Sequence, residues 1–146
     1  MRDTATRKAD VLAMLEKQGD LWLATADRSG KPHVIPVSAW WDGEDLVVAT
    51  TGSSRTARNL APRNEARLAA GTPADAIVID AEVVERVPAT DAGMVAEGFS
   101  RAVGWDPLDV GEGWVFFRLK PSRIQAYRGY HELQGREVMR RSKWLA

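Results

Sequence analysis

The sequence predicts a mainly β fold with a few peripheral helices, arranged as an antiparallel barrel of six or seven strands. Most apolar residues fall in short runs with a period of two, and tight turns join consecutive runs, as in β-hairpins. Few segments have helical periodicity, which argues against a doubly wound parallel sheet. The 146 residues, 45% of them hydrophobic, suit a single domain with a sizeable core.

The first third of the chain predicts one helix followed by a meander of strands. Ala9, Leu12 and Leu15 fall near helical spacing, so a helix is expected over residues 6–18. After this helix the period changes to two. The strands are expected at residues 21–26, 32–41 and 45–51. Pro36 lies inside the second strand and lacks an N–H group, which predicts a strand edge, a bulge or a closely approaching ligand there.

The rest of the chain continues the pattern. The expected elements are a helix at 54–60, strands at 66–70 and 76–84, a helix opened by 88–91 and ending near 103, and strands at 114–120 and 123–127. The rings of Trp22 and Trp114 are predicted to lie in the core because they fall at strand spacing. We expect one domain over residues 1–146, with a core at about 8–128 and a polar, basic tail at 131–146.

Composition narrows the possible functions. The chain has no cysteine, which removes thiolate chemistry and fits a reducing cytoplasm, and no histidine and carboxylate spacing typical of a metal site is present. Its 20 basic residues balance its 20 acidic residues, so we expect neither a nucleic-acid partner nor a membrane partner. No apolar run approaches the roughly 20 residues that span a bilayer. No nucleophile or acid–base motif identifies a catalytic residue, which favours a reaction carried by a bound cofactor.

The strongest chemical signal is the segment 50–59, where a strand ends, a glycine follows and a helix begins. The N-terminus of a helix presents unpaired N–H groups and a partial positive charge, both of which suit a phosphate. Hydroxyl and guanidinium groups add further donors: Thr50, Thr51, Ser53, Ser54, Arg55 and Arg58. The alternative is that a serine only caps the helix and the arginines are solvated.

Two further features allow more than one interpretation. Trp40 and Trp41 occupy both faces of one strand, so one ring points away from the barrel core, toward a subunit interface or a flat ligand. The tail has four basic residues that suggest RNA binding, Arg136, Arg140, Arg141 and Lys143, but the balanced net charge favours a solvated or salt-bridged tail.

Several segments together resemble the pyridoxamine 5'-phosphate oxidase-related split-barrel superfamily, over roughly residues 8–128. They are Leu21–Thr25, Gly30-Lys31-Pro32-His33-Val34-Ile35-Pro36-Val37, Leu46–Thr51, Arg55-Thr56-Ala57-Arg58-Asn59-Leu60 and Arg118-Leu119-x-Pro121…Ile124-x-Ala126-Tyr127. The combination of the Gly-x-Pro-x-x-x-Pro-Val strand with the Ser-Arg-x-x-Arg-Asn-Leu helix start is the more specific part.

The resemblance implies a split β-barrel that forms a homodimer and holds FMN, or the deazaflavin coenzyme F420, in a groove between subunits. It places Val34, Pro36, Val37 and Ser38 beside the isoalloxazine ring. It assigns the phosphate and ribityl portion to Thr50, Thr51, Ser54, Arg55, Thr56, Arg58 and Asn59, and the groove to Trp40 and Trp41. Many members have lysine where this chain has Thr56, so one cationic contact is missing, and FMN either binds more weakly or is replaced by another phosphate-bearing cofactor.

The first hypothesis is therefore a flavin- or deazaflavin-dependent oxidoreductase that transfers hydride or electrons to an unidentified small molecule, with FMN as the expected cofactor. The second is a noncatalytic flavin or haem carrier, because the barrel of this superfamily also hosts haem degradation and noncatalytic flavin binding. The third is a structural dimer whose groove stays empty. Fold alone does not choose between these hypotheses.

Overall fold

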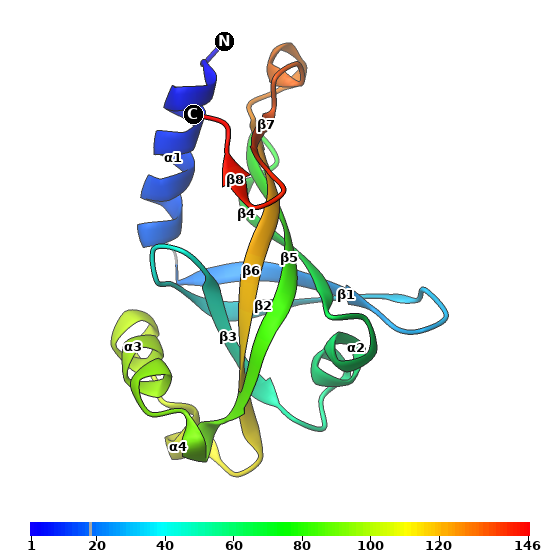
Figure 1. Ribbon diagram of the computed structural model, residues 1–146, viewed down its shortest axis with the longest axis vertical. Helices are drawn as coiled ribbons and strands as arrows, with labels where there is room; N and C mark the ends of the chain where they lie inside the picture. The colour runs from blue at the N-terminus through cyan, green and yellow to red at the C-terminus, as the bar shows by residue number, and fades with distance from the viewer. Residues whose placement is uncertain (18) are drawn as a thin grey trace.

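The computed structural model describes residues 1–17 and 19–146, and it forms a closed antiparallel β-barrel with peripheral helices (Figure 1). The strands are β1 (Asp20–Ala26), β2 (Pro32–Trp41), β3 (Leu46–Thr51), β4 (Glu65–Thr72), β5 (Asp75–Pro88), β6 (Trp114–Tyr127), β7 (Glu137–Arg140) and β8 (Lys143–Trp144). Their order is β3-β2-β1-β4-β5-β6-β7-β8, and pairing of β3 with β6 closes a six-stranded barrel. The mainly β barrel predicted from the sequence is confirmed.

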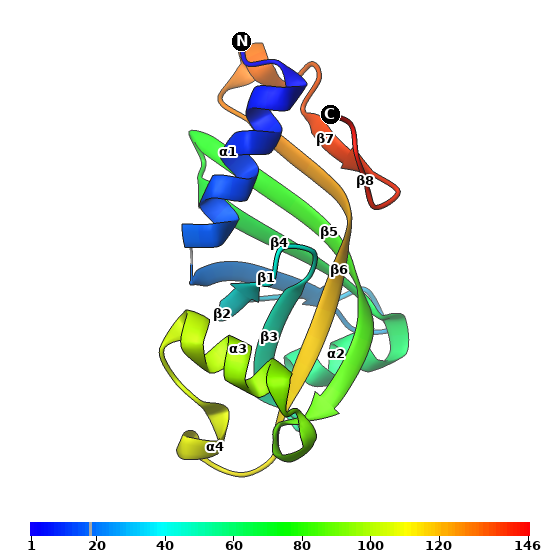
Figure 2. The ribbon, with the colours of Figure 1, turned by 60° about the vertical axis from the view of Figure 1, so that its left-hand side comes forward.

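Strands β5 and β6 form a long ribbon that runs from one end of the molecule to the other (Figure 2). The sequence predicted two strands on either side of Pro121, but β6 is continuous. Its register shifts from Asp80 opposite Arg123 to Ala81 opposite Pro121, so Ser122 is an extra bulged residue. The Ser122 hydroxyl donates to the carbonyl of Asp80 at 3.2 Å, and the ribbon bends at this bulge without ending.

The helices are α1 (Thr4–Lys17), α2 (Arg55–Arg63), α3 (Met94–Val103) and α4 (Pro107–Val110), with short 3-10 turns at Ala89–Asp91 and Tyr130–Glu132. The expected last residue of the first helix, Gln18, lies outside the described residues. The third helix was predicted to open at 88–91, but β5 extends to Pro88. Gly93 then has a φ of +52°, which separates the 3-10 turn from the start of α3. The second helix was predicted to end at residue 60, but α2 continues to Arg63 and includes Pro62 in its last turn.

Two apolar clusters hold the molecule together. The barrel interior is filled by inward-facing strand residues, with Val11 and Leu15 of α1 and Ala57 and Leu60 of α2 in the same cluster. The second cluster lies outside the barrel, where α3 covers β2, β3 and β6. At its centre the ring of Phe99 packs edge-on, with its centroid 5.2 Å from that of Phe116. Trp22 was predicted to be in the core, but its side chain lies on the outer face of β1 and is 54% exposed.

The C-terminal segment, predicted to be a solvated or salt-bridged tail, is part of the folded structure. Strand β7 pairs with β6, and the apolar residues Val138 and Met139 are buried against the barrel. Ion pairs also occur here, because Glu137 binds the guanidinium groups of both Arg123 and Arg140. Among the described residues, no helix is long and apolar enough to cross a membrane.

A buried charge network fastens the N-terminal helix to the C-terminal segment. The guanidinium group of Arg7 is 2% exposed and donates to the carbonyls of Ala126 and Glu132, each at 3.0 Å. The carboxylate of Glu132 accepts from the Arg2 guanidinium at 2.7 Å and from the Arg128 N–H at 2.8 Å. Hydrogen bonds from the Arg2 side chain, and further ones from backbone N–H groups, hold the pKa of Glu132 far below its ordinary value.

The Glu132→Gln variant is expected to lose about 3 kcal/mol of stability, because it leaves the largely buried Arg2 charge without a carboxylate. The folded-state pKa of Glu132 is depressed, so its stabilisation is fully present above the ordinary glutamate value of 4.5 and is lost as the pH falls below it. Urea unfolding between pH 7 and pH 3 tests this. The variant should depend less on pH than the wild type, and the exposed control Glu112→Gln should behave as the wild type does; parallel curves for all three proteins would contradict the assignment.

Gly98→Ala is expected to destabilise the protein by about 1–3 kcal/mol through overpacking. A Cβ atom on Gly98 of α3 would lie only 2.6 Å from Cζ2 and Cζ3 of Trp40, inside van der Waals contact. Thermal unfolding measures the loss. The matched control is Gly111→Ala, whose Cβ would meet no atom within 4 Å. If both variants have the same Tm, α3 does not press on Trp40 as described.

Candidate functional site

The start of α2 is built by a serine cap. The Ser54 Oγ accepts the N–H of Ala57 at 3.0 Å and the hydroxyl of Thr50 at 2.8 Å. Just before the cap, the Gly52 N–H donates to the carbonyl of Gly113 at 2.8 Å, which ties the loop to the start of β6. The capping role that the sequence left open for Ser54 is therefore present, and its Oγ is already engaged as an acceptor.

The first turn of α2 still has unpaired donors. Within the described part of the chain, the N–H groups of Arg55 and Thr56 have no acceptor, as expected for the first positions of a helix. The N–H of Ala57 is used by the cap, and the N–H of Arg58 by the carbonyl of Ser54. Two N–H groups and the positive end of the helix dipole are therefore available to an anion.

Arg55 and Arg58 lie one turn apart on the exposed side of α2 and line an open cleft of about 760 Å³. The opposite wall of this cleft is the turn between β1 and β2, which contributes Asp27, Arg28 and Ser29. Figure 1 shows this hairpin extending beyond the barrel beside α2. Three arginine side chains from two separate segments thus surround one cleft, and Arg28 lies outside the segment 50–59 that indicated the site.

Asp27 organises the turn through its hydrogen bonds, and within the described residues it makes no ion pair with the arginines of the cleft. Its Oδ1 accepts the Ser29 hydroxyl at 2.6 Å and the Lys31 N–H at 2.9 Å. These hydrogen bonds, with a smaller contribution from the charge of Arg55, hold the pKa of Asp27 below its ordinary value. The carboxylate is therefore ionised at neutral pH and fixes the shape of the cleft wall.

Asn59 joins α2 to β1 beneath the cleft. Its side chain is 4% exposed, and its Nδ2 donates to the Oγ1 of the buried Thr25 at 3.1 Å. The hydrogen bond to Thr25 fixes the distance between α2 and β1. Asn59 also lines the cleft, so the same amide presents polar atoms to the cavity. Thr56 differs: it is 1% exposed and faces the interior, so its side chain does not reach the cleft.

The predicted residues of β2 lie on a different surface. Val34 is 58% exposed and Pro36 is also exposed on the outer face of β2, where Pro36 is paired with Trp22 of β1. Of the alternatives raised for Pro36, the strand edge is present, because β2 pairs with β3 only over Ala39–Trp41. Trp22, Val34 and Pro36 form an exposed apolar strip, which we call the β1–β2 strip.

The other side chains assigned to β2 are already occupied within the chain. Val37 points into the barrel core, so only its backbone is available to a ligand. The Ser38 Oγ accepts the indole N–H of Trp105 at 3.0 Å. Trp41 is buried in the barrel core, and Trp40 points outward, as predicted, but is covered by α3 of the same chain. Neither ring lies free in a groove.

The structure therefore groups the predicted residues in three places. Arg55, Arg58 and Asn59 share the cleft beside α2, and Thr50, Thr51 and Ser54 form the loop and cap that precede this helix. Val34 and Pro36 belong to the β1–β2 strip, outside the cleft lining. Among the described residues, no cluster of histidine and carboxylate side chains suits a metal ion.

The model of the pyridoxamine 5'-phosphate oxidase family matches residues 8–128. The chain belongs to this family. Among solved structures, an F420 reductase has a TM-score of 0.66 with 20% identity, over 77% of this chain and 93% of that one. HutZ, described as the haem storage protein of Vibrio cholerae, has a TM-score of 0.61 with 17% identity, over 94% and 99%. No curated protein sequence matches the chain.

A further solved structure is that of a putative pyridoxamine 5'-phosphate oxidase from Listeria innocua. It has a TM-score of 0.66 with 16% identity, over 82% of this chain and 96% of that one. At these identities the likeness establishes the fold. Because proteins of this fold include both a reductase and a haem storage protein, the function of this chain has to be argued from its own residues.

Thr25→Val is expected to cost about 1–3 kcal/mol, because it leaves the buried Nδ2 of Asn59 without an acceptor while keeping the side-chain volume. Urea unfolding measures the loss, with Thr90→Val, at an exposed position, as the control. The double variant Thr25→Val/Asn59→Leu removes both polar partners and should recover part of the stability. A double variant as unstable as the sum of its single variants would argue against the hydrogen bond.

Proposed function

We propose that the cleft beside α2 binds the phosphate end of FMN, with the deazaflavin coenzyme F420 as the alternative, and that the protein is an oxidoreductase. The observation that carries this proposal is the convergence of Arg28, Arg55 and Arg58 on one cleft. Within the described residues, Arg28 and Arg58 have no carboxylate partner. Such a concentration of positive charge on a chain of zero net charge is typical of an anion-binding site.

The donor set fits a phosphate in chemistry as well as in charge. Guanidinium groups match the oxygens of a phosphate as two-pronged donors, and the free N–H groups of Arg55 and Thr56 add backbone donors at the N-terminal end of the same helix. Asn59 offers its amide to a hydroxyl group of a sugar or a ribityl chain. These groups bind and orient a ligand, and none of them requires a change in protonation to do so.

The β1–β2 strip is the proposed contact for the rest of the ligand and for a second subunit. Trp22, Val34 and Pro36 expose flat or branched apolar groups on neighbouring strands, and a surface of this kind is stabilised when it is covered. We propose that the protein is a homodimer and that the ring lies between this strip and the second copy. Covering the ring in this way would exclude water from it.

When bound, the flavin ring supplies hydride and electron transfer, so the chain itself needs no nucleophile. The proposed roles of the protein are therefore limited to its own groups. Arg55 and Arg58 hold the phosphate, Asn59 fixes the separation of α2 from β1, and the apolar strip shields the ring. The second substrate is a small molecule that reaches the ring from the side left open.

The second candidate is a noncatalytic flavin or haem carrier, which the likeness to HutZ over 94% of this chain supports. The same arginines would pair with the carboxylates of haem. The two candidates differ in one property: an oxidoreductase reduces an acceptor when a reductant of the cofactor is supplied, and a carrier binds its ligand without turnover.

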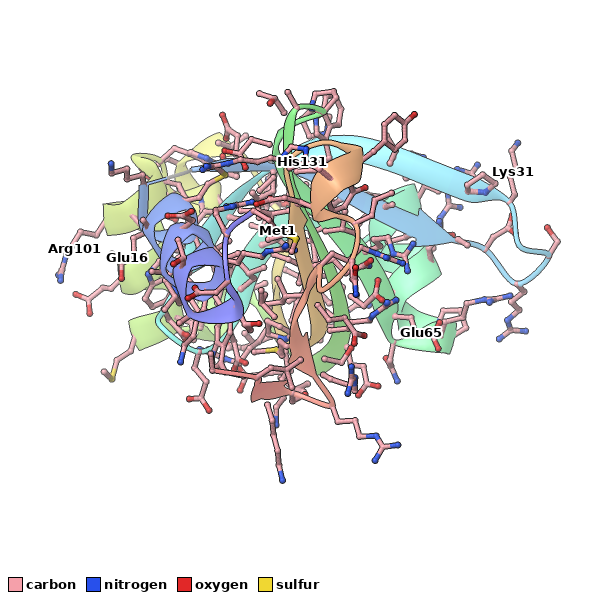
Figure 3. The ribbon with its side chains drawn as sticks, turned by 90° about the horizontal axis from the view of Figure 1, so that it is seen from above. Met1, Glu16, Lys31, Glu65, Arg101 and His131 are labelled. Carbon is pink, nitrogen blue, oxygen red and sulfur yellow. The ribbon has the colours of Figure 1, made fainter. Side chains whose placement is uncertain are left out.

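Arg58→Ala is expected to weaken binding of FMN by more than tenfold, because it removes one charge-assisted hydrogen bond, worth about 1.5–3 kcal/mol. Parallel titrations of the protein with FMN, F420 and haemin, followed by ligand fluorescence or absorbance, measure the affinities. The matched control is Arg101→Ala on α3, and Figure 3 shows Arg101 on the opposite side of the molecule from Lys31 at the β1–β2 turn.

An Arg58→Ala variant that binds FMN or F420 as the wild type does would contradict the location of the site. Tight binding of haemin alone would replace the oxidoreductase proposal with the carrier. No binding of any of the three ligands below about 100 μM would contradict both candidates and leave the empty structural dimer.

A further inference from the structure

We propose that Arg86 of β5 is an additional phosphate-binding residue of this site, contributed from a strand that only β6 separates from β3 in the closed barrel. The inference rests on the proposed function and extends it by one residue. Arg86 lies 28 residues beyond Arg58 in the sequence, outside every motif that indicated the site. Its Nη2 atom lies 3.4 Å from the position that a Cβ on Gly52 would occupy, so the guanidinium group contacts the loop that leads into α2.

A β-bulge directs Arg86 to this position. Along β5, Ile77, Ile79 and Ala81 point into the barrel, and simple alternation would continue with residues 83, 85 and 87. The register shifts between Val83 and Glu85, which inserts one residue and exchanges the two faces. Beyond the bulge Arg86 pairs with the inward-facing Phe117, and Val87 packs against the outer cluster beneath α3.

The guanidinium group is held in place but is not neutralised. Its central carbon lies 5.3 Å from the centroid of the Phe117 ring, a cation–π contact that leaves the N–H edges free. The neighbouring Glu85 is directed toward Arg118, with its Oε1 3.8 Å from the Arg118 Nε. Within the described residues Arg86 makes no ion pair, and its side chain is solvent-exposed.

Arg86 is therefore an unpaired cation beside the loop that leads into α2, and it lies outside the residues that line the cleft itself. Gly52 precedes Arg55 by three residues, and the N–H groups of Arg55 and Thr56 follow directly. The side chain of Thr56 is buried and contributes nothing to this surface. The start of α2 thus has arginines near it on two elements, Arg86 on β5 and Arg55 and Arg58 on α2. This arrangement suits a phosphate, because its oxygens can accept from both elements at once.

Riboflavin, which is FMN without its phosphate, provides the test. We expect Arg86→Ala to weaken binding of FMN at least tenfold and to change binding of riboflavin by less than twofold. Arg101→Ala should change neither, and Arg86→Gln provides a second variant that removes the charge but keeps a polar side chain. Far-UV circular dichroism and Tm establish that each variant is folded. If F420 is the ligand that binds, F420 and its phosphate-free chromophore take the places of FMN and riboflavin.

The comparison separates failure of this inference from failure of the proposed function. A wild-type protein that binds riboflavin as tightly as FMN contradicts a phosphate site altogether. A wild-type protein that prefers FMN, with the same preference retained in both Arg86 variants, overturns only the role of Arg86. Equal losses for FMN and riboflavin would identify Arg86 as a structural residue and also overturn the inference.

Discussion

The closure of the barrel by β3 and β6 determines the position of everything near the candidate site. Six residue pairs, from Leu46 opposite Leu119 to Thr51 opposite Trp114, join strands that are far apart in the sequence. This pairing brings the end of β3 to the start of β6, where Gly52 donates to Gly113 and the chain turns into α2. Without the closure, the loop, the serine cap and the exposed face of α2 would have no fixed relation to β5 or to the β1–β2 hairpin.

Helices α2 and α3, which pack on the barrel, have different roles. Helix α2 places Leu60 and Ala57 in the barrel core and leaves Arg55 and Arg58 outside, so burial of its apolar face aims its charges at the cleft. Helix α3 is used for packing, because Gly98 allows the ring of Trp40 to lie against its backbone. An outward tryptophan that suggested a subunit interface is therefore covered within the chain, and the exposed apolar surface lies instead at Trp22, Val34 and Pro36.

Local patterns predicted the barrel strands because alternation and tight turns are encoded within a few residues of each strand. They did not predict that β6 continues through Pro121, since the bulge at Ser122 forms only against Asp80 of β5. The cap and the arginines of α2 were also readable, because they are adjacent in the sequence. Arg28 and Arg86 could not be predicted from the sequence. Arg28 lies at the cleft because the β1–β2 hairpin folds beside α2, and Arg86 faces Gly52 because of a bulge in β5.

The central claim is that a phosphate-bearing ligand binds at the start of α2. The most direct test is to follow the backbone amide resonances of the isotope-labelled protein by NMR as FMN is added, with riboflavin as the reference. The account predicts that the amides of Arg55 and Thr56 shift on addition of FMN and shift much less with riboflavin. The largest shifts in a region remote from α2, such as the cleft beside Asp10 of α1 and Arg128, would contradict it.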